Sequence, residues 1–308
     1  MAVVAVDCGG TNLIWGRAES PATIEVAGRV PTPREVAAIP AAVAGAVRPL
    51  IDRSVRAIGV GSAGLVDHAA GILVSSPHSR GGPVRLGAEV STATGLPVVV
   101  DNDANLAALA EARLGAGAGY RMVLLVALGT GIGGGLVVGG AVERGRAFLG
   151  EAGHMVVDAS GPACPCGRYG CWEALVSGTS LGRAARAIAD ADPAGPVARA
   201  AAGGTPRGEH LSAAAGEGDP RAKAALAEAG GWLGRGLANL VVLLDPDVIV
   251  IGGGAAAAGE ALLDPARVTL AAAVGGVGYR SPTPVVAARF GSRAGLVGAA
   301  LAAEEARW

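Results

Sequence analysis

The chain has 308 residues, which is long for a single compact core, so two domains or one large α/β unit are expected. Its 25 Lys and Arg residues are balanced by 26 Asp and Glu residues, and the formal net charge is −1. This balance argues against a basic surface for nucleic acid or an anionic membrane and favours a small-molecule substrate.

The first part of the chain alternates short apolar runs with glycine turns and helical segments. A strand from Val3 to Val6 ends at Asp7, and after a glycine turn the chain returns as a second strand, Leu13 to Arg17. The further elements expected here are a helix over 33–53, strands over 57–61 and 96–100, and a helix over 102–114. The glycine-rich run 115–119 predicts a linker to a second lobe.

The second part of the chain repeats the same plan. Met122 to Leu128 predicts a strand that ends in a glycine turn, after which a strand returns through 136–138. The later elements expected are helices over 178–190, 219–244, 255–263 and 294–307, with strands over 248–251 and 285–289. We expect glycines to break the helix over 219–244, and the last helix to pack back on the first lobe. The repeat predicts a duplicated α/β fold.

The segment from Met122 to Val142 has no charged residue and is long enough to cross a bilayer as a helix. It also contains seven glycines, each of which costs a helix about 1 kcal/mol relative to alanine. We therefore expect two strands joined by a glycine turn. The N-terminus shows no basic segment followed by a cleavage site, so the cytoplasm is the expected location.

Asp7 and the turn Gly9-Gly10-Thr11 follow the first strand. Glycine turns are common, so an ordinary turn remains an alternative. The functional interpretation is a phosphate clamp, in which glycines let backbone N–H groups approach an anion, Thr11 adds a hydroxyl, and Asp7 arranges Mg²⁺ or its water shell. The second glycine turn, over 128–135, supports this interpretation, because two such turns can hold the two ends of a triphosphate.

The run Asp101-Asn102-Asp103-Ala104-Asn105 follows an apolar strand and opens a helix. Asp and Asn are favoured as helix caps, so capping alone is one interpretation. Capping needs only one such residue, however, and α/β folds place their ligands at the carboxyl ends of strands. Asp103 is the candidate general base.

The densest group of chemically active residues lies between Glu151 and Glu173. It contains one histidine and three cysteines, which match the Cys₃His set that Zn²⁺ prefers. The four candidate ligands are His154, Cys164, Cys166 and Cys171. A disulfide or inert thiols are the alternatives, but Cys-x-Cys spacing is unfavourable for a bridge. Zinc with four protein ligands has no open position, so its role would be structural, and it would draw the flanking carboxylates toward one site.

A third glycine turn, Gly252-Gly253-Gly254, follows the strand over 248–251. Alone it is a weak signal, but as the third turn of this kind it suggests a nucleoside site. His68 and His210 lie outside the cysteine cluster, and we interpret them as solvent-facing rather than as ligands. Cys8 is interpreted as a small buried apolar residue.

Together these motifs resemble those of the ROK family of repressors and sugar kinases, which has the actin-like ATPase fold. Asp7 to Thr11 looks like the family's first phosphate motif, Asn102 to Asn105 like its catalytic segment, and 128–135 like its second phosphate motif. The run from Glu151 to Glu173 resembles the family's zinc signature and is the most specific match. The resemblance covers nearly the whole chain and is greatest to the ATP-dependent glucokinases of bacteria, particularly actinobacteria.

The resemblance implies an α/β, actin-like ATPase (ribonuclease H-like) fold with two duplicated lobes and an interlobe cleft. Residues 1–117 would form a small N-terminal lobe, completed by a C-terminal helix over 293–308. Residues 118–292 would form a large lobe with the zinc and nucleotide sites. A homodimer or homotetramer is implied, with neither nucleic acid nor membrane as a partner.

The resemblance also implies an enzyme that uses ATP, Mg²⁺ and a structural Zn²⁺ to phosphorylate the C6 hydroxyl of glucose, with Asp103 accepting the hydroxyl proton. The implied sugar-binding residues are Gly64, His78, Asn102, Asp103, Glu151, His154 and Glu173. The nucleotide-binding positions are Asp7, Gly9, Gly10, Thr11, Asn12, Gly129, Thr130, Gly131, Gly252, Gly253 and Gly254. The implied zinc ligands are His154, Cys164, Cys166 and Cys171.

The chain departs from the family pattern near the sugar. Ala63 stands where the family usually has proline, and a Pro-Asn pair followed three residues later by Trp reads here as Pro77-His78 with Gly81. The hexose therefore stays open, with mannose, fructose or an N-acylhexosamine as alternatives to glucose, and polyphosphate is an alternative to ATP. A sugar-sensing transcription regulator of the same family is disfavoured, because only six residues precede Asp7 and no DNA-binding helix-turn-helix is visible.

Overall fold

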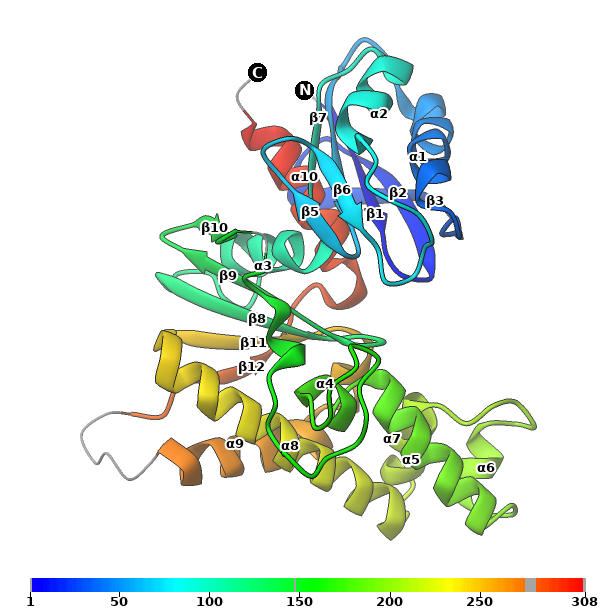
Figure 1. Ribbon diagram of the computed structural model, residues 1–308, viewed down its shortest axis with the longest axis vertical. Helices are drawn as coiled ribbons and strands as arrows, with labels where there is room; N and C mark the ends of the chain where they lie inside the picture. Colours follow the sequence, from blue (N-terminus) through cyan, green and yellow to red (C-terminus); the bar gives the residue numbers. More distant parts are fainter. Residues whose placement is uncertain (1, 147, 275–280, 307–308) are drawn as a thin grey trace. The chain divides into compact units, whose positions relative to one another are not determined.

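The structure is a computed structural model that describes residues 2–146, 148–274 and 281–306. The chain divides into two compact units (Figure 1). Unit 1 comprises Met1–Arg121, Gly135–Gly150 and Ser292–Trp308, and unit 2 comprises Met122–Gly134 and Glu151–Gly291. The segment Gly135–Gly150, which the sequence prediction assigned to the second lobe, thus belongs to unit 1.

Unit 1 is built on a five-stranded sheet in the order β3-β2-β1-β4-β7. Its strands are β1 (Ala2–Cys8), β2 (Asn12–Ala18), β3 (Ile24–Pro31), β4 (Val55–Ser62) and β7 (Val98–Asn102). β1 pairs antiparallel with β2 and parallel with β4, and β4 pairs parallel with β7. Cys8 pairs with Ser62, and Ser62 with Asn102, so three parallel strands end at one edge. This register brings the first glycine turn and the Asp103 segment to the same edge.

Helices cover both faces of this sheet. Even-numbered residues of β1 share one core cluster with α1 (Ile39–Val47) and α2 (Leu86–Thr94), as the alternation of side chains along a strand requires. Helix α10 (Ala294–Glu305) packs on β1, β4 and α3 (Asp103–Leu114), as expected of the closing helix. The smaller strands of this unit are β5 (Leu65–Asp67), β6 (Ile72–Ser75) and β10 (Ala141–Glu143). The helix predicted over 33–53 is shorter, because 3₁₀ turns replace its ends.

The second sheet repeats the topology of the first, with the order β10-β9-β8-β11-β12. Its remaining strands are β8 (Met122–Leu128), β9 (Ile132–Val138), β11 (Val248–Gly252) and β12 (Val285–Ala287). β11 pairs parallel with β8 and β12, and β10 pairs antiparallel with β9. In each sheet the first strand is central, the next two lie on one side, and the last two on the other. The predicted duplication of an α/β fold is confirmed.

Unit 2 contains most of the remaining helices. They are η4 (Glu151–His154), α4 (Trp172–Leu175), α5 (Gly178–Ala191), α6 (Pro196–Ala200), α7 (Gly208–Gly216), α8 (Pro220–Leu244), η5 (Gly254–Ala258) and α9 (Glu260–Val274). The expected break in the helix over 219–244 was wrong, since α8 is continuous. Gly230 and Gly234 lie directly against the backbone of α9, and Gly236 lies against Trp172, so these glycines allow close packing.

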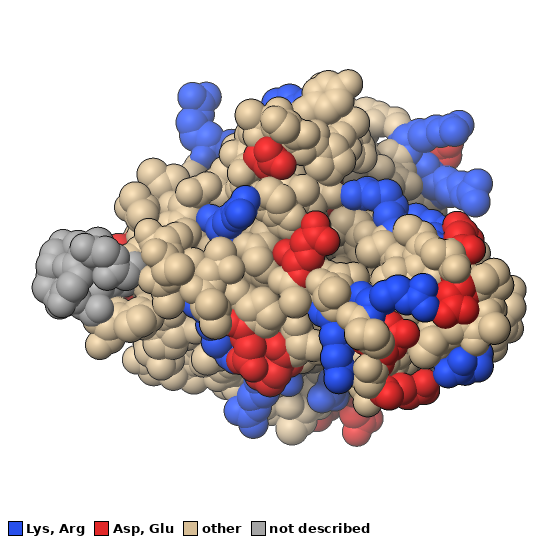
Figure 2. Space-filling view, turned by 90° about the horizontal axis from the view of Figure 1, so that it is seen from below, with Lys and Arg blue, Asp and Glu red and all other residues tan. Residues whose placement is uncertain are grey.

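The apolar segment from Met122 to Val142 forms strands β8 and β9 and the start of β10, as predicted. Among the described residues, no helix combines the length and apolar character needed to cross a membrane. On the face shown in Figure 2, basic and acidic side chains are interspersed, which agrees with the net charge of −1.

Candidate active site

The first glycine turn of unit 1 follows β1 and leads into β2 (Figure 1). Gly9 N–H donates to the carbonyl of Asn12 at 3.0 Å, and the Thr32 hydroxyl donates to the Gly9 carbonyl at 2.7 Å, so the turn is held from both sides. Burial raises the pKa of Asp7 to about 7, and the negative charge of Asp103 acts in the same direction. The two carboxylates therefore belong to one electrostatic site.

The Asp103 segment joins β7 to α3. Asn102 is the N-cap of α3: its side-chain oxygen accepts from the N–H groups of Ala104 and Asn105 at 2.9 and 3.1 Å. Asp103 is the next residue, in the first turn, where the helix dipole favours negative charge. The Asn102 side chain also donates to the carbonyl of Gly64 at 3.0 Å, which connects two predicted sugar-binding positions.

Asp101, directly before Asn102, is a buried carboxylate whose partners the sequence did not reveal. It accepts from the Arg144 guanidinium at 2.6 and 2.9 Å, and His68 Nδ1 lies 3.5 Å away. The side chain of His68 is 35% exposed, and its ring also hydrogen-bonds the Val100 carbonyl at 2.8 Å, so it is only partly solvent-facing. Arg144 lies 43 positions from Asp101, and no local pattern connects them.

His210, also expected to face solvent, is likewise tied into the fold. Its Nδ1 accepts from the N–H of Arg207 at 3.0 Å, and this bond is part of a capping box at the start of α7. Both histidines are thus partly exposed, and both are also bonded to the backbone. The His68 ring bonds a carbonyl within β7 and the His210 ring bonds the N–H at the N-cap of α7, and composition and spacing do not reveal such contacts.

His78, where the family resemblance implies an asparagine, is exposed and lies against the first glycine turn. A β-carbon on Gly10 would collide with the His78 ring, so the two residues are in direct contact. Gly81, where the family resemblance implies an aromatic residue, has a φ of +122°. Residues other than glycine rarely adopt a backbone conformation with this positive φ, so this loop does not favour a tryptophan at position 81.

The second glycine turn lies in unit 2, between β8 and β9. Gly178 N–H donates to the Gly129 carbonyl at 2.8 Å, and the Thr179 hydroxyl donates to the Thr130 carbonyl at 2.7 Å. The Glu173 carboxylate accepts from the N–H of Ile132 at 2.9 Å. A predicted sugar ligand thus contacts the predicted phosphate turn, a proximity that sequence reasoning did not anticipate.

The third glycine turn lies beside the second. Gly253 is so close to the backbone of Leu128 that a β-carbon would not fit between them. Since Leu128 ends β8 and Gly252 ends the parallel strand β11, both turns lie at the carboxyl ends of their strands. This is where α/β folds place their ligands.

The Cys₃His cluster forms as predicted. The ligand atoms of His154, Cys164, Cys166 and Cys171 all lie within 4.8 Å of one another. The Cys166 and Cys171 sulfurs are 3.5 Å apart, and Cys164 Sγ lies 3.8 Å from His154 Nδ1. Hydrogen bonds from Arg168 lower the pKa of Cys166 to about 6, whereas burial raises that of Cys171 to about 12.

Glu151 and His154 occupy the two ends of η4. His154 directs Nδ1 toward the sulfurs, and its other nitrogen, Nε2, lies 3.9 Å from the Glu151 carboxylate. Gly153, between them, lies against the backbone of Ile132, which adjoins the second glycine turn. Unit 2 thus brings Glu151, His154 and Glu173 together around that turn.

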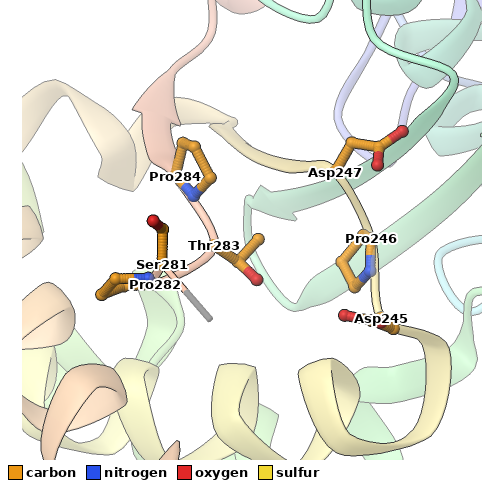
Figure 3. Close-up of a pocket in the computed structure, with 7 residues that line it drawn as sticks. All are labelled: Asp245, Pro246, Asp247, Ser281, Pro282, Thr283 and Pro284. Atoms are coloured by element: carbon orange, nitrogen blue, oxygen red, sulfur yellow. The ribbon is translucent and has the colours of Figure 1, made fainter. Parts of the chain in front are cut away.

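An open pocket of about 520 Å³ lies elsewhere in unit 2 (Figure 3). Its lining residues are Asp245, Pro246, Asp247, Ser281, Pro282, Thr283 and Pro284. They precede β11 and β12 and therefore lie at the amino ends of these strands, opposite to the glycine turns. None of the predicted site residues lines this pocket.

Two sheets of the same topology, each with a glycine turn after its first strand, define an α/β protein with the actin-like ATPase fold. The ROK family model matches residues 3–306, so the chain belongs to the ROK family, as the sequence motifs predicted. It is 39% identical to a glucokinase of Streptomyces coelicolor over 98% of this chain and 97% of that protein.

Two further comparisons cover nearly the whole chain. The crystal structure of a ROK family glucokinase from Streptomyces griseus in complex with glucose and AMPPNP has a TM-score of 0.88 and 38% identity, covering 99% of this chain and 100% of that one. An N-acetylmannosamine kinase of Salmonella typhi is 32% identical over 99% of both chains.

Proposed function

We propose that this protein is a sugar kinase that transfers the γ-phosphoryl group of ATP to the C6 hydroxyl of glucose. The observation that carries the proposal is the position of Asp103. It lies in the first turn of α3, at the same edge of the sheet as the first glycine turn, and its charge acts on Asp7. Full-length similarity to glucokinases supports glucose and ATP as the substrates.

The glycine turns suit phosphate binding, because glycine lets backbone N–H groups approach an anion closely. A β-carbon at Gly10 or Gly131 would collide with His78 or Glu173, respectively. Asp7 would hold Mg²⁺ or its water shell, and a cation there would favour the ionised form of a carboxyl whose pKa burial has raised. When bound, Mg²⁺ neutralises charge on the phosphates.

The reaction needs positioning and charge stabilisation more than covalent chemistry. The C6 oxygen attacks the γ-phosphorus, the bond from that phosphorus to the bridging oxygen of ADP breaks, and the hydroxyl proton passes to Asp103. Asn102, Gly64 and His78 in unit 1 would bind the hexose. Glu151, His154 and Glu173 in unit 2 are the other proposed hexose ligands.

The cysteine cluster suits a structural zinc ion. In a tetrahedral zinc site two sulfur ligands lie about 3.8 Å apart, and a sulfur and a nitrogen ligand about 3.6 Å apart. The Cys166 and Cys171 sulfurs are 3.5 Å apart, and Cys164 Sγ is 3.8 Å from His154 Nδ1, close to these values. With four protein ligands the metal has no open position for substrate. Its proposed task is to hold Glu151 and His154 in place, with the free nitrogen of His154 available to a sugar hydroxyl.

A kinase for another hexose is the second candidate. His78 against Gly10, and Gly81 where related proteins carry an aromatic residue, change the loop expected to contact the sugar. Small changes in a pocket shift discrimination between similar substrates by about 10- to 200-fold. The full-length similarity to an N-acetylmannosamine kinase also favours keeping this candidate. The homo-oligomeric state and cytoplasmic location stay predictions.

The experiment that tests the proposal is ADP formation by the purified protein with glucose, mannose, fructose, N-acetylglucosamine and N-acetylmannosamine, each with ATP or polyphosphate. We expect the highest kcat/KM with glucose and ATP, and glucose 6-phosphate as the product. A higher kcat/KM with another hexose would establish the second candidate. No phosphorylated product from any hexose, with either donor, would overturn the assignment as a kinase.

A further inference from the structure

The buried carboxylate of Asp101 joins the catalytic segment to one arginine. Its Oδ1 accepts from the backbone N–H of Asn102 at 2.8 Å and from the side chain of Asn105 at 3.1 Å. Its Oδ2 accepts from Nε and Nη2 of Arg144 at 2.9 and 2.6 Å. Only 1% of Asp101 is exposed, so its charge depends on these partners rather than on water.

These bonds hold the backbone on both sides of Asp103. Asn102, before it, is bonded to Asp101 through its N–H and caps α3 through its side chain. Asn105, after it, is bonded to Asp101 through its side-chain amide. A displacement of about 1 Å in a reacting group can cost roughly 100-fold in rate, so the placement of this short segment matters.

We propose that Arg144 is a positioning residue for phosphoryl transfer, acting through Asp101 to hold Asp103 in its working orientation. The proposal rests on the proposed function of Asp103 as general base. Arg144 follows β10, and its Nη1 donates to the Val142 carbonyl at 3.1 Å, so the guanidinium is itself oriented. A guanidinium with parallel N–H donors fixes a carboxylate more rigidly than a lysine ammonium does.

A purely structural role would be that Arg144 only fastens the segment 135–150 to the rest of unit 1. The chain offers a matched control in Arg113, near the far end of α3. Its Nε donates to the Gly140 carbonyl of the same segment at 3.0 Å, and its Nη2 lies 3.3 Å from Glu305. Arg113 therefore fastens the same segment without touching the Asp101 group.

The test compares Arg144→Gln, Arg144→Lys and Arg113→Gln in the full chain. We expect Arg144→Gln to lower kcat about 100-fold with little change in glucose affinity, measured by calorimetry, and Arg113→Gln to leave kcat near the wild-type value. Amide hydrogen exchange at Ala104 and Asn105 should accelerate in Arg144→Gln but not in Arg113→Gln. Because Arg144→Gln leaves a buried charge without its main partner, Arg144→Lys provides a variant that keeps that charge paired.

Equal losses of kcat in Arg144→Gln and Arg113→Gln would overturn the positioning role, as would wild-type kcat and exchange in both Arg144 variants. Lower kcat and faster exchange in Arg144→Lys, with the fold retained, would support it even if Arg144→Gln does not fold. If the wild-type protein phosphorylates no hexose, the proposed function fails. Hydrogen exchange then still decides whether Arg144 orders the segment around Asp103.

Discussion

Asp7 and Asp103 are two carboxylates of unit 1 with different proposed tasks. Burial and the charge of Asp103 raise the pKa of Asp7 to about 7. Since an unfolded aspartate titrates near 3.9, protonated Asp7 favours the folded state at low pH, and this contribution is lost as the pH rises through about 7. A bound cation would restore the ionised carboxylate, so the pair is suited to a site that binds metal and phosphate together.

At the residue scale, Asp103→Asn should lower kcat by at least about 100-fold while glucose binding is retained, because it removes the proton acceptor and little else. Initial rates of ADP formation and calorimetric glucose titration measure the two effects. Asp67→Asn is the control, since Asp67 is an exposed acid of the same unit whose carboxylate accepts from the local N–H of Ala70. Near-native turnover by Asp103→Asn would remove Asp103 from its proposed role.

At the scale of elements, the closing helix α10 is held very close to its neighbours. A β-carbon at Gly298 would collide with the Leu106 carbonyl of α3, and one at Gly59 of β4 would collide with the Ala299 carbonyl of α10. Glycine is therefore required on both sides of this packing. The same close packing supports α3, whose first turn carries Asp103.

We expect Gly298→Ala to destabilise the protein by about 1–3 kcal/mol, since an added methyl group in a filled core forces backbone shifts. Gly45→Ala in α1 is the matched control, because nothing lies within 4 Å of the added carbon. A helical Gly-to-Ala change at an open position stabilises by up to about 1 kcal/mol. Urea unfolding of the two variants should therefore show changes of opposite sign, and equal stability of both would contradict the packing described.

At the scale of the whole molecule, one sheet topology occurs twice, whereas in the described part of the chain the cysteine cluster occurs only in unit 2. Cys166→Ser should reduce the metal content from about one zinc ion per chain to almost none, because a structural site needs all four ligands. The melting temperature should fall with it. Elemental analysis measures the zinc content, and a thermal scan measures the melting temperature. The zinc content should decrease as the pH is lowered, because protons compete with the metal for the thiolates.

Cys8→Ala is the control for this prediction. Cys8 is buried in the core of unit 1, whereas the cluster belongs to unit 2, so this variant should keep its zinc. Similar metal contents in Cys166→Ser and Cys8→Ala would show that the Cys₃His cluster is not the metal site.

The sequence alone determined the features that depend on neighbouring residues. Apolar runs ending in glycine turns predicted β1, β8 and β11, and the repeat of this pattern predicted the duplication. The Cys₃His set and the Asp103 segment were also recognisable, because their members lie within about two dozen positions and one helical turn, respectively. Local backbone preference and ligand chemistry are sufficient to predict such features.

Tertiary structure alone decided which distant groups meet. Arg144 reaches Asp101 from 43 positions away, and Glu173 reaches the Ile132 N–H from 41. His78 against Gly10 and the unbroken helix α8 likewise depend on packing partners that no local pattern encodes. A buried carboxylate or a glycine in a helix is stable only with its partners in place, and the fold determines those partners.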